Sequence, residues 1–324
     1  MPDSATVHQD DVRWYADTFD RVTHNVEAAV LGKRHVVRLA LTCLVSGGHL
    51  LLEDLPGTGK TMLARALAKS LDCSFARIQF TPDLLPSDVT GVSVYNRANG
   101  SFEFRPGGIF ANLVVGDEIN RASPKTQSAL LEAMEERQVT VDGTTYALEP
   151  PFMVIATQNP VEHEGTYPLP ESQLDRFLMR IGMGYPDRAA EIGILDTHGR
   201  TDPSASLRPV ASAADVQTMT ALAGAIHVAP SLKGYIVDVA AATRAHPQLA
   251  LGVSPRAALG LLRAARARAA SMGRDYVVPD DLKVLALPVL EHRLALTGDA
   301  QLRGVNRGDV LLSVLSTVSV PAAR

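Results

Sequence analysis

The segment from Asp54 to Thr61 limits most strongly what this chain can fold into. It has the sequence Asp-Leu-Pro-Gly-Thr-Gly-Lys-Thr, and it follows a short apolar run over residues 49–54 of the kind that forms a buried parallel strand. A helical pattern over residues 61–71 comes next. Glycines between a strand and a helix let backbone N–H groups turn inward around a polyphosphate, and the helix N-terminus adds positive potential. The segment therefore predicts a phosphate-binding loop.

The polar residues of this loop have separate predicted roles. Lys60 supplies a cation to the β- and γ-phosphates of a nucleotide, and Thr61 offers its hydroxyl to Mg²⁺. One position departs from the usual pattern, because Asp54 stands where the first glycine is expected. The other predicted nucleotide contacts are Gly57, Thr58, Gly59 and Met62.

Two carboxylates follow a second apolar run. Asp117 and Glu118 come directly after Leu113-Val-Val-Gly, at the end of a predicted strand, where α/β sheets bind their ligands. Asp117 is predicted to hold Mg²⁺ through water, and Glu118 to polarise the water that attacks the phosphate. Such a pair could also cap a helix after a core strand. The phosphate-binding loop upstream favours the catalytic interpretation.

Apolar runs alternate with helical patterns over the first half of the chain. The pattern predicts helices over residues 18–31 and 33–45, a helix that Ser123 and Pro124 begin, and further strands over 74–80, 112–116, 152–157 and 177–183. This alternation is typical of a parallel sheet flanked by helices, here with five strands. The turn signal Asp142-Gly143 predicts a hairpin.

Composition changes near residues 184–187, beyond which we find only helical patterns. These cover residues 188–197, 213–226, 232–246, 256–272 and 279–294. We therefore predict three parts of the chain: an N-terminal tail over 1–14, an α/β core over 15–186 with inserts near 81–110 and 137–151, and an all-helical lid over 187–324.

Charge and composition exclude several classes of protein. The formal net charge of −4 argues against a protein that coats nucleic acid, so we expect no direct nucleic-acid partner. No apolar run approaches the length of a membrane span, and the acidic N-terminus lacks the apolar segment of a secretory signal. With two cysteines in 324 residues, a disulfide scaffold is not expected either. We expect a soluble, cytoplasmic protein.

The order and spacing of six segments resemble those of the MoxR family of AAA+ ATPases. The resemblance covers roughly residues 20–300, and the departure at Asp54 is common in that family. The segments that carry it are Leu52–Thr61, Gln79–Asp88, Asp117–Ala122, Ala156–Pro160, Leu169–Phe177 and Val253–Arg256.

The resemblance implies roles for four more residues. Asn159 matches the sensor-1 position, where a polar side chain senses the γ-phosphate and orients water. Arg176 matches the arginine finger, which reaches the nucleotide of a neighbouring subunit. Arg256 matches sensor 2, and Gly32 lies where the family contacts adenine. Without the neighbouring motifs, Asn159 would be read as part of an Asn-Pro turn, and the two arginines as surface side chains.

The resemblance also implies the activity. We expect an ATPase that binds ATP and Mg²⁺, assembles as a homo-oligomer, most simply a hexameric ring, and remodels or matures a partner protein. The family often works with a separately encoded von Willebrand A-domain protein. Three alternatives remain open: an ATPase like the I subunit of magnesium chelatase, a nucleic-acid motor, and a nucleotide-gated scaffold with little hydrolysis.

Overall fold

The computed structural model describes residues 8–54, 57–159, 166–197 and 203–321, which form two compact units. The first unit, here called the core unit, comprises residues 21–169 and 181–217. The second, the lid unit, comprises residues 1–20, 170–180 and 218–324.

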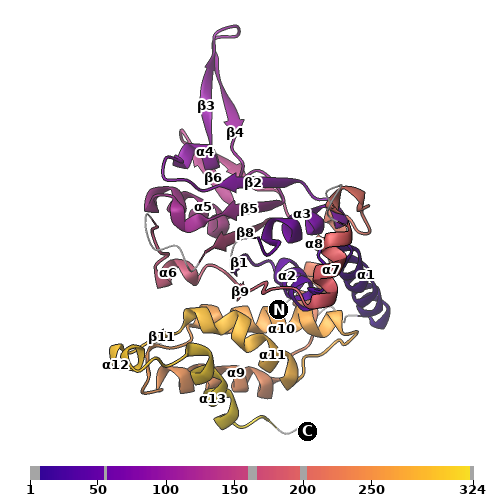
Figure 1. Cartoon of the computed structure of the whole chain (residues 1–324), viewed down its shortest axis with the longest axis vertical. Coiled ribbons are helices and arrows are strands. Elements are labelled where there is room, and N and C mark those ends of the chain that lie inside the picture. Colours follow the sequence, from indigo (N-terminus) through magenta and orange to yellow (C-terminus); the bar gives the residue numbers. More distant parts are fainter. Residues whose placement is uncertain (1–7, 55–56, 160–165, 198–202, 322–324) are drawn as a thin grey trace, which may run out of the picture. The chain divides into compact units, whose positions relative to one another are not determined.

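A five-stranded sheet organises the core unit, as predicted. In Figure 1 the strands follow one another in the order β2, β5, β8, β1 and β9. The pairs β2–β5, β5–β8 and β1–β8 are all parallel. Their bounds are β1 Leu50–Glu53, β2 Phe75–Gln79, β5 Leu113–Asp117, β8 Met153–Gln158 and β9 Met179–Ile181.

Parallel register brings the polar ends of the strands to one edge of this sheet. Gln79 is paired with Asp117, and Glu53 with Gln158, each at the last position of its strand. Because the carboxyl ends of parallel strands meet at the same edge, polar residues that are distant in sequence become neighbours there.

Helices flank the sheet, and most lie within a few residues of the predicted bounds. They are α2 Arg34–Val45, α3 Lys60–Ser70, α5 Pro124–Glu136 and α7 Arg188–Thr197, with the 3-10 turns η1 Ile119–Arg121 and η2 Pro203–Ser206. Helix α5 begins as predicted, because the Ser123 hydroxyl accepts the Thr126 N–H and Pro124 occupies the first position.

Helix α1 (Gln9–Glu27) begins earlier than the sequence pattern predicted. It includes residues 9–14, which we expected to belong to an irregular tail. The buried residues Val12 and Tyr15 extend the apolar face of the helix toward the N-terminus. Asp10 and Asp11 lie in the first turn, where negative charge stabilises a helix.

Residues 187–217 belong to the core unit, although the change in composition predicted that the lid begins at residue 187. Their backbone forms hydrogen bonds to helix α3 of the core unit. The N–H groups of Val210 and Ala211 donate to the carbonyl oxygen of Ser70, at 2.9 and 3.2 Å. The exact division between core and lid stays a prediction.

The two inserts of the core unit each contain a hairpin. One comprises α4 Pro86–Thr90, β3 Gly91–Asn96 and β4 Ser101–Pro106, and the other comprises β6 Gln138–Val141 and β7 Thr144–Ala147. The predicted turn lies at Asp142-Gly143, where both residues have positive φ. The hairpin β3–β4 projects from the sheet (Figure 1), and at its base Phe104 stacks on Tyr146 of β7, with ring centroids 3.9 Å apart.

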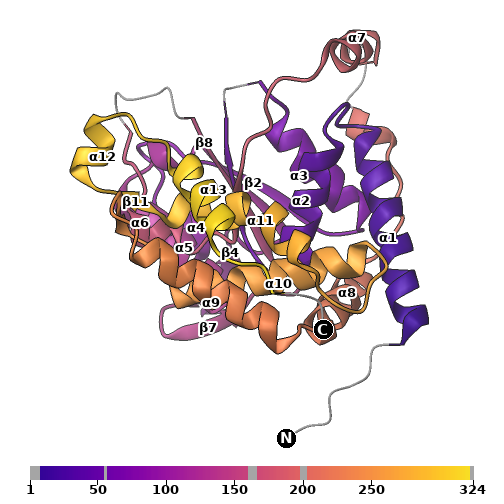
Figure 2. The same cartoon turned by 90° about the horizontal axis from the view of Figure 1, so that it is seen from below.

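The lid unit is mainly helical. Its helices α9, α10, α11 and α13 pack together (Figure 2), and the short strands β10 and β11 form one antiparallel pair that the sequence pattern did not predict. The bounds are α6 Glu171–Leu174, α9 Pro230–Arg244, β10 Leu249–Leu251, α10 Pro255–Ser271, α11 Pro279–Leu290, η3 Glu291–Arg293, β11 Ala295–Leu296, α12 Gly298–Leu302 and α13 Arg307–Thr317. Helix α8 (Ala213–Ala225) begins in the core unit and ends in the lid unit.

The predicted helix over residues 279–294 ends four residues early. The chain turns at η3, and Leu294 adopts an extended conformation that leads into β11. Among the described helices, none has the length and hydrophobicity that crossing a bilayer requires.

Packing around Gly116 limits the residue that can precede the two carboxylates. A Cβ atom at this position would lie 3.3 Å from both Leu130 and the Phe80 ring. We expect Gly116→Ala to change the free energy of unfolding by less than about 1 kcal/mol, because the end of Leu130 can shift. Gly116→Val should cost about 1–3 kcal/mol, since its extra methyl groups meet a fully buried ring. Urea unfolding of both variants measures this, and equal stabilities would contradict the tight packing.

Candidate functional site

The loop between β1 and α3 has the backbone that a phosphate cradle requires. Gly57 and Gly59 have φ values of 80° and 92°, a region that favours glycine, and Gly59 is the N-cap of α3. A Cβ atom on Gly57 would meet nothing within 4 Å, so the backbone conformation rather than crowding explains this glycine. Helix α3 then begins at Lys60 and directs its N-terminus toward the loop.

Lys60 lies among three carboxylates. Its ammonium group donates to the carbonyl oxygen of Asp54 at 2.6 Å. Partial burial lowers the pKa of Lys60, and the negative charges of Asp54, Asp117 and Glu118 oppose this shift. The lysine is therefore a half-buried cation held at the loop, beside the predicted catalytic acids.

Asp54, at the departure from the usual loop pattern, has a clear structural role. Its carboxylate accepts the backbone N–H of Gly184, which follows β9. The side chain thus ties the start of the loop to the segment beyond the neighbouring strand, which a glycine could not do.

Thr157, near the end of β8, joins the two predicted catalytic acids. Its hydroxyl donates to Oδ1 of Asp117 at 2.6 Å and accepts the backbone N–H of Glu118 at 2.9 Å. Glu118 has a positive φ of 55°, which is uncommon for a residue with a side chain. The Thr157 hydroxyl supports this conformation and fixes the direction in which both acids leave the strand.

Side chains from β2 and η1 engage Oδ2 of Asp117 and Oε2 of Glu118. Arg77 forms an ion pair with Oδ2 of Asp117 at 2.6 Å and also donates to the Gln79 side chain at 2.8 Å. Gln79 in turn donates to Oε2 of Glu118 at 2.8 Å, and Arg121 donates to the same oxygen at 3.0 Å. The two acids are therefore part of one continuous polar network.

Sequence reasoning missed Arg77, Gln79, Arg121 and Thr157. The sequence feature that could have indicated two of them is the alternation of side chains along β2. It places Arg77 and Gln79 on the same face of the strand, at its carboxyl end. Their partners could not be found from the sequence, because the bonds depend on the register between β2 and β5.

A cavity of about 390 Å³ collects the predicted catalytic residues of the core unit. Asn159, which is 7% exposed, lines it together with residues of the loop, β2, β5 and β8. The residues of this cavity that the sequence predicted are Gly57, Gly59, Lys60, Thr61, Met62, Asp117, Glu118 and Asn159.

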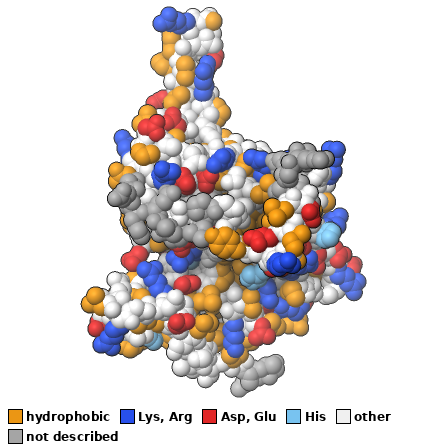
Figure 3. Space-filling model, in the orientation of Figure 1, with side chains coloured by type: hydrophobic (Ala, Val, Ile, Leu, Met, Phe, Trp, Pro, Cys, Tyr) orange, Lys and Arg blue, Asp and Glu red, His pale blue; other side chains and the backbone are white. Residues whose placement is uncertain are grey.

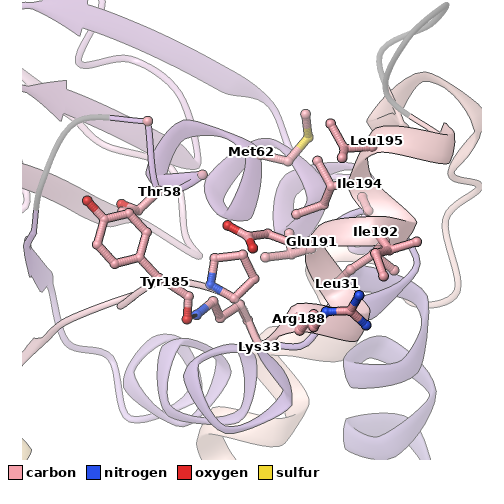
Figure 4. Close-up of a pocket in the computed structure, with 15 residues that line it drawn as sticks. Leu31, Lys33, Thr58, Met62, Tyr185, Arg188, Glu191, Ile192, Ile194 and Leu195 are labelled. Atoms are coloured by element: carbon pink, nitrogen blue, oxygen red, sulfur yellow. Dashed lines mark hydrogen bonds between the residues drawn. The ribbon is translucent and has the colours of Figure 1, made fainter.

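A second cavity of about 780 Å³ shares the loop glycines and Met62 with the first. Figure 4 shows Met62, Ile194 and Leu195 on one side and Tyr185 on the other, with Glu191 between them. The mainly apolar lining, together with a few polar groups, is typical of a slot for a flat ring.

Gly32 has a packing role beside this second cavity. Its neighbours Leu31 and Lys33 line the cavity, and Thr58 lies across from them. Gly32 has a φ of 70°, and a Cβ atom there would lie 2.7 Å from that of Ala190 on α7. A direct contact between Gly32 and a ligand stays a prediction.

The oxygen donors of the first cavity fit Mg²⁺. Mg²⁺ is usually held by one or two protein oxygens and completes its shell with water and phosphate oxygens. Thr61 and Asp117 are donors of this kind. A richer protein site is absent from the described part of the chain, where no cluster of three or more His, Cys, Asp or Glu side chains could hold a metal.

Arg176 and Arg256 belong to the lid unit. Arg176 follows α6 and is partly buried, and Arg256 lies in the first turn of α10, after the N-cap Ser254. Their predicted roles toward a nucleotide stay predictions.

The turn η3 of the lid unit holds two buried basic residues that sequence reasoning did not use. His292 contacts the backbone oxygen of Phe177 through Nε2 at 3.1 Å, so Nε2 carries the proton, because a carbonyl can only accept. Burial, with Arg293 and Arg180 nearby, lowers the pKa of His292 to about 3. Burial also lowers the pKa of Arg293 to about 10, which leaves it charged at neutral pH.

Comparison with known proteins gives a consistent result. Residues 49–179 match the ATPase family associated with various cellular activities (AAA), and residues 241–312 match the AAA lid domain. The chain is 50% identical to the protein YeaC of Bacillus subtilis, over 94% of this chain and 95% of YeaC. It is 42% identical to Chaperone MoxR1 of Mycobacterium tuberculosis, over 94% and 82% of the two chains, and 31% identical to Protein MoxR of Methylorubrum extorquens, over 95% and 96%.

A solved structure agrees with these sequence matches. A candidate ATPase from Cytophaga hutchinsonii superposes with a TM-score of 0.91 and is 39% identical in sequence. The match covers 97% of this chain and 98% of the other.

The bridging hydroxyl of Thr157 can be tested by isosteric substitution. Thr157→Val keeps the shape but leaves the Glu118 N–H without its acceptor, so the free energy of unfolding should fall by about 1–3 kcal/mol. ATP turnover should fall about tenfold, because the two acids lose their common support. Thr157→Ser retains the hydroxyl and should restore both properties. Thermal unfolding and steady-state turnover measure them, and a stable, active Thr157→Val variant would contradict the role.

The low pKa of His292 predicts a dependence of stability on pH. Below pH 6.5 the unfolded chain binds a proton at this histidine, whereas the folded chain does so only near pH 3. The free energy of unfolding should therefore fall as the pH drops through this window, by about 2 kcal/mol between pH 6.5 and 5. His292→Asn should weaken the dependence, and the exposed control His35→Asn should leave it unchanged. Equal pH profiles for all three proteins would exclude His292 as the cause.

Proposed function

Because the chain belongs to the MoxR family of AAA+ ATPases, we propose that it hydrolyses ATP in a ring of identical subunits and thereby remodels or matures a partner protein. The observation that carries this proposal is the cavity of the core unit that is lined by Lys60, Thr61, Asp117, Glu118 and Asn159. A phosphate-binding lysine, a paired carboxylate site and a polar sensor together serve the transfer of a phosphoryl group to water.

Binding uses the two adjoining cavities. The adenine ring occupies the mainly apolar cavity near Leu31, Met62 and Tyr185, and the phosphates lie against the loop and the N-terminus of α3. Lys60 exchanges the Asp54 carbonyl for phosphate oxygens, which are stronger partners for a cation.

Hydrolysis depends on positioning and on charge. Glu118 orients and polarises the attacking water, and Asn159 holds that water toward the γ-phosphate. Thr61 and Asp117 would hold Mg²⁺, which would supply positive charge against the phosphate oxygens. Gln79 and Arg121 both donate to Oε2 of Glu118 and thereby orient its carboxylate.

The lid unit contributes the remaining cations. Arg256 contacts the nucleotide of its own subunit. Arg176 instead reaches the nucleotide of the neighbouring subunit, so that each active site needs two chains. This arrangement is heterologous and closes into a ring, which we propose is a hexamer. We also propose that the ring acts in the cytoplasm, without direct contact to nucleic acid, and works with a separately encoded von Willebrand A-domain protein or another client.

The projecting hairpin β3–β4 offers a surface for such a client. The side chains of Tyr95 and Phe102 are 52% and 73% exposed, and Figure 3 shows hydrophobic side chains along the hairpin. Exposed aromatic side chains on a projecting element favour contact with another protein.

The decisive experiment is steady-state ATP hydrolysis per subunit as a function of protein concentration. A site shared between subunits predicts that the specific rate rises as the ring assembles. Glu118→Gln should retain ATP binding and lose turnover about 100-fold or more, because the amide cannot polarise water. Lys60→Ala should lose binding itself.

Two outcomes would contradict the proposal. A specific rate independent of concentration, with the protein monomeric in ATP, would exclude the shared site. A rate equal to that of Glu118→Gln at every concentration would favour a nucleotide-gated scaffold instead.

A further inference from the structure

We infer that Arg293, on the turn η3 of the lid unit, is a positioning residue that sets the orientation of Arg176. The inference rests on the proposed function, in which Arg176 acts on the nucleotide of the neighbouring subunit. In this role Arg293 does not touch the nucleotide. It acts only through the backbone and the charges around Arg176.

The guanidinium of Arg293 holds the backbone on both sides of Arg176. Its Nη2 donates to the carbonyl oxygen of Asp175 at 3.2 Å and to that of Phe177 at 2.8 Å. The Nε2–H of His292 donates to the Phe177 oxygen as well, at 3.1 Å. The peptide unit before Arg176 and the one after Phe177 are therefore held by one turn of the lid, which restricts the direction in which the Arg176 side chain leaves the chain.

An ion pair and a further hydrogen bond also hold Arg293 in place. Nε of Arg293 forms an ion pair with Oδ1 of Asp175 at 2.8 Å, and its Nη1 donates to the carbonyl of Val289 in α11 at 2.7 Å. Nη1 and Nη2 thus donate hydrogen bonds to backbone carbonyls, and Nε adds the charge contact with Asp175. Its side chain is only 4% exposed, so each of these interactions acts with little screening by water.

The cost of burying Arg293 argues against a role in stability alone. A buried ion pair is often no more stable than well-packed apolar residues of similar volume, because two charges must be desolvated. Arg256 and Arg263, which are also positive, add repulsion at this site. What the planar guanidinium provides, and an apolar side chain or a lysine could not, is several directed bonds at fixed angles.

Helix α10 leaves room for this guanidinium. A Cβ atom on Gly260 would lie 3.4 Å from Nη1 of Arg293 and 3.0 Å from Leu178, so the absence of a side chain admits both. The same helix carries Arg256 in its first turn. The turn η3 therefore links the segment of Arg176 to the lid helix of the other predicted nucleotide-contacting arginine.

The first test is substitution within the pair. Arg293→Lys keeps the positive charge but removes the planar guanidinium with its several donors. Asp175→Asn keeps the shape of the side chain but removes its negative charge. We expect Arg293→Lys to lower kcat for ATP about tenfold to 100-fold with KM changed less than about threefold, because misplacing a catalytic group impairs the chemical step. Asp175→Asn should give a smaller loss of the same kind. Arg303→Lys is the matched control, since the side chain of Arg303 is 71% exposed and pairs with the equally exposed Asp299.

A mixing experiment separates positioning of Arg176 from damage to the subunit's own active site. Subunits with Arg293→Lys have an intact core unit, and subunits with Glu118→Gln have an intact Arg176. In a randomly mixed ring about one interface in four joins an intact site to an intact finger, so the equimolar mixture should regain about a quarter of the wild-type rate. Each variant alone should stay far below that rate.

A parallel mixture of Arg176→Ala with Glu118→Gln distinguishes the two possible failures. If this mixture regains no activity, the shared site of the proposed function is wrong. If it regains activity and the Arg293→Lys mixture does not, Arg293 acts elsewhere and the inference is overturned. Wild-type kcat in folded Arg293→Lys also overturns it. Should Arg293→Lys fail to fold, as judged by circular dichroism, Asp175→Asn replaces it in the mixture and the same outcomes decide.

Discussion

Parallel pairing of β5 with β8 is the constraint on which the site depends. The pairing sets Gly116 opposite Ala156, so that the next residues along the two strands, Asp117 and Thr157, can bond side chain to side chain. A shift of one residue would turn each of these side chains to the opposite face. The apolar residues of the two strands, all buried, fix the register, and the polar chemistry at the edge follows from it.

Charge around the core cavity is balanced before any ligand is considered. Asp117 and Glu118 are each engaged by an arginine, Arg77 and Arg121, and Lys60 donates to a backbone carbonyl. An arriving polyphosphate and its metal ion must therefore compete with protein partners already in place. Exchange of partners, rather than filling of an empty site, is how nucleotide binding would alter the positions of β2 and η1.

Much of this architecture could be predicted from the sequence. Local signals were sufficient for the loop before α3, the Ser-Pro start of α5 and the Asp-Gly turn between β6 and β7, because each depends on a few adjacent residues. What failed depended on distant contacts. The early start of α1 and the ladder β10–β11 are both decided by packing partners far away in sequence.

The site shows the same division. Lys60, Thr61, Asp117 and Glu118 could be predicted as site residues because they form contiguous motifs next to a predicted strand end. Thr157 could not be predicted, since nothing in its own neighbourhood indicates that its hydroxyl joins two residues 39 and 40 positions away.

The stacked rings of Phe104 and Tyr146 connect the two inserts, so that a movement of one is transmitted to the other. A hairpin with six residues in each strand extends about 20 Å from its base. Rotation of about 10° at the base would displace its tip by about 3 Å, which is nearly one residue of an extended chain. A small rearrangement where β6 meets α5 would therefore be amplified along the hairpin and displace Phe102, near its tip, by a larger distance.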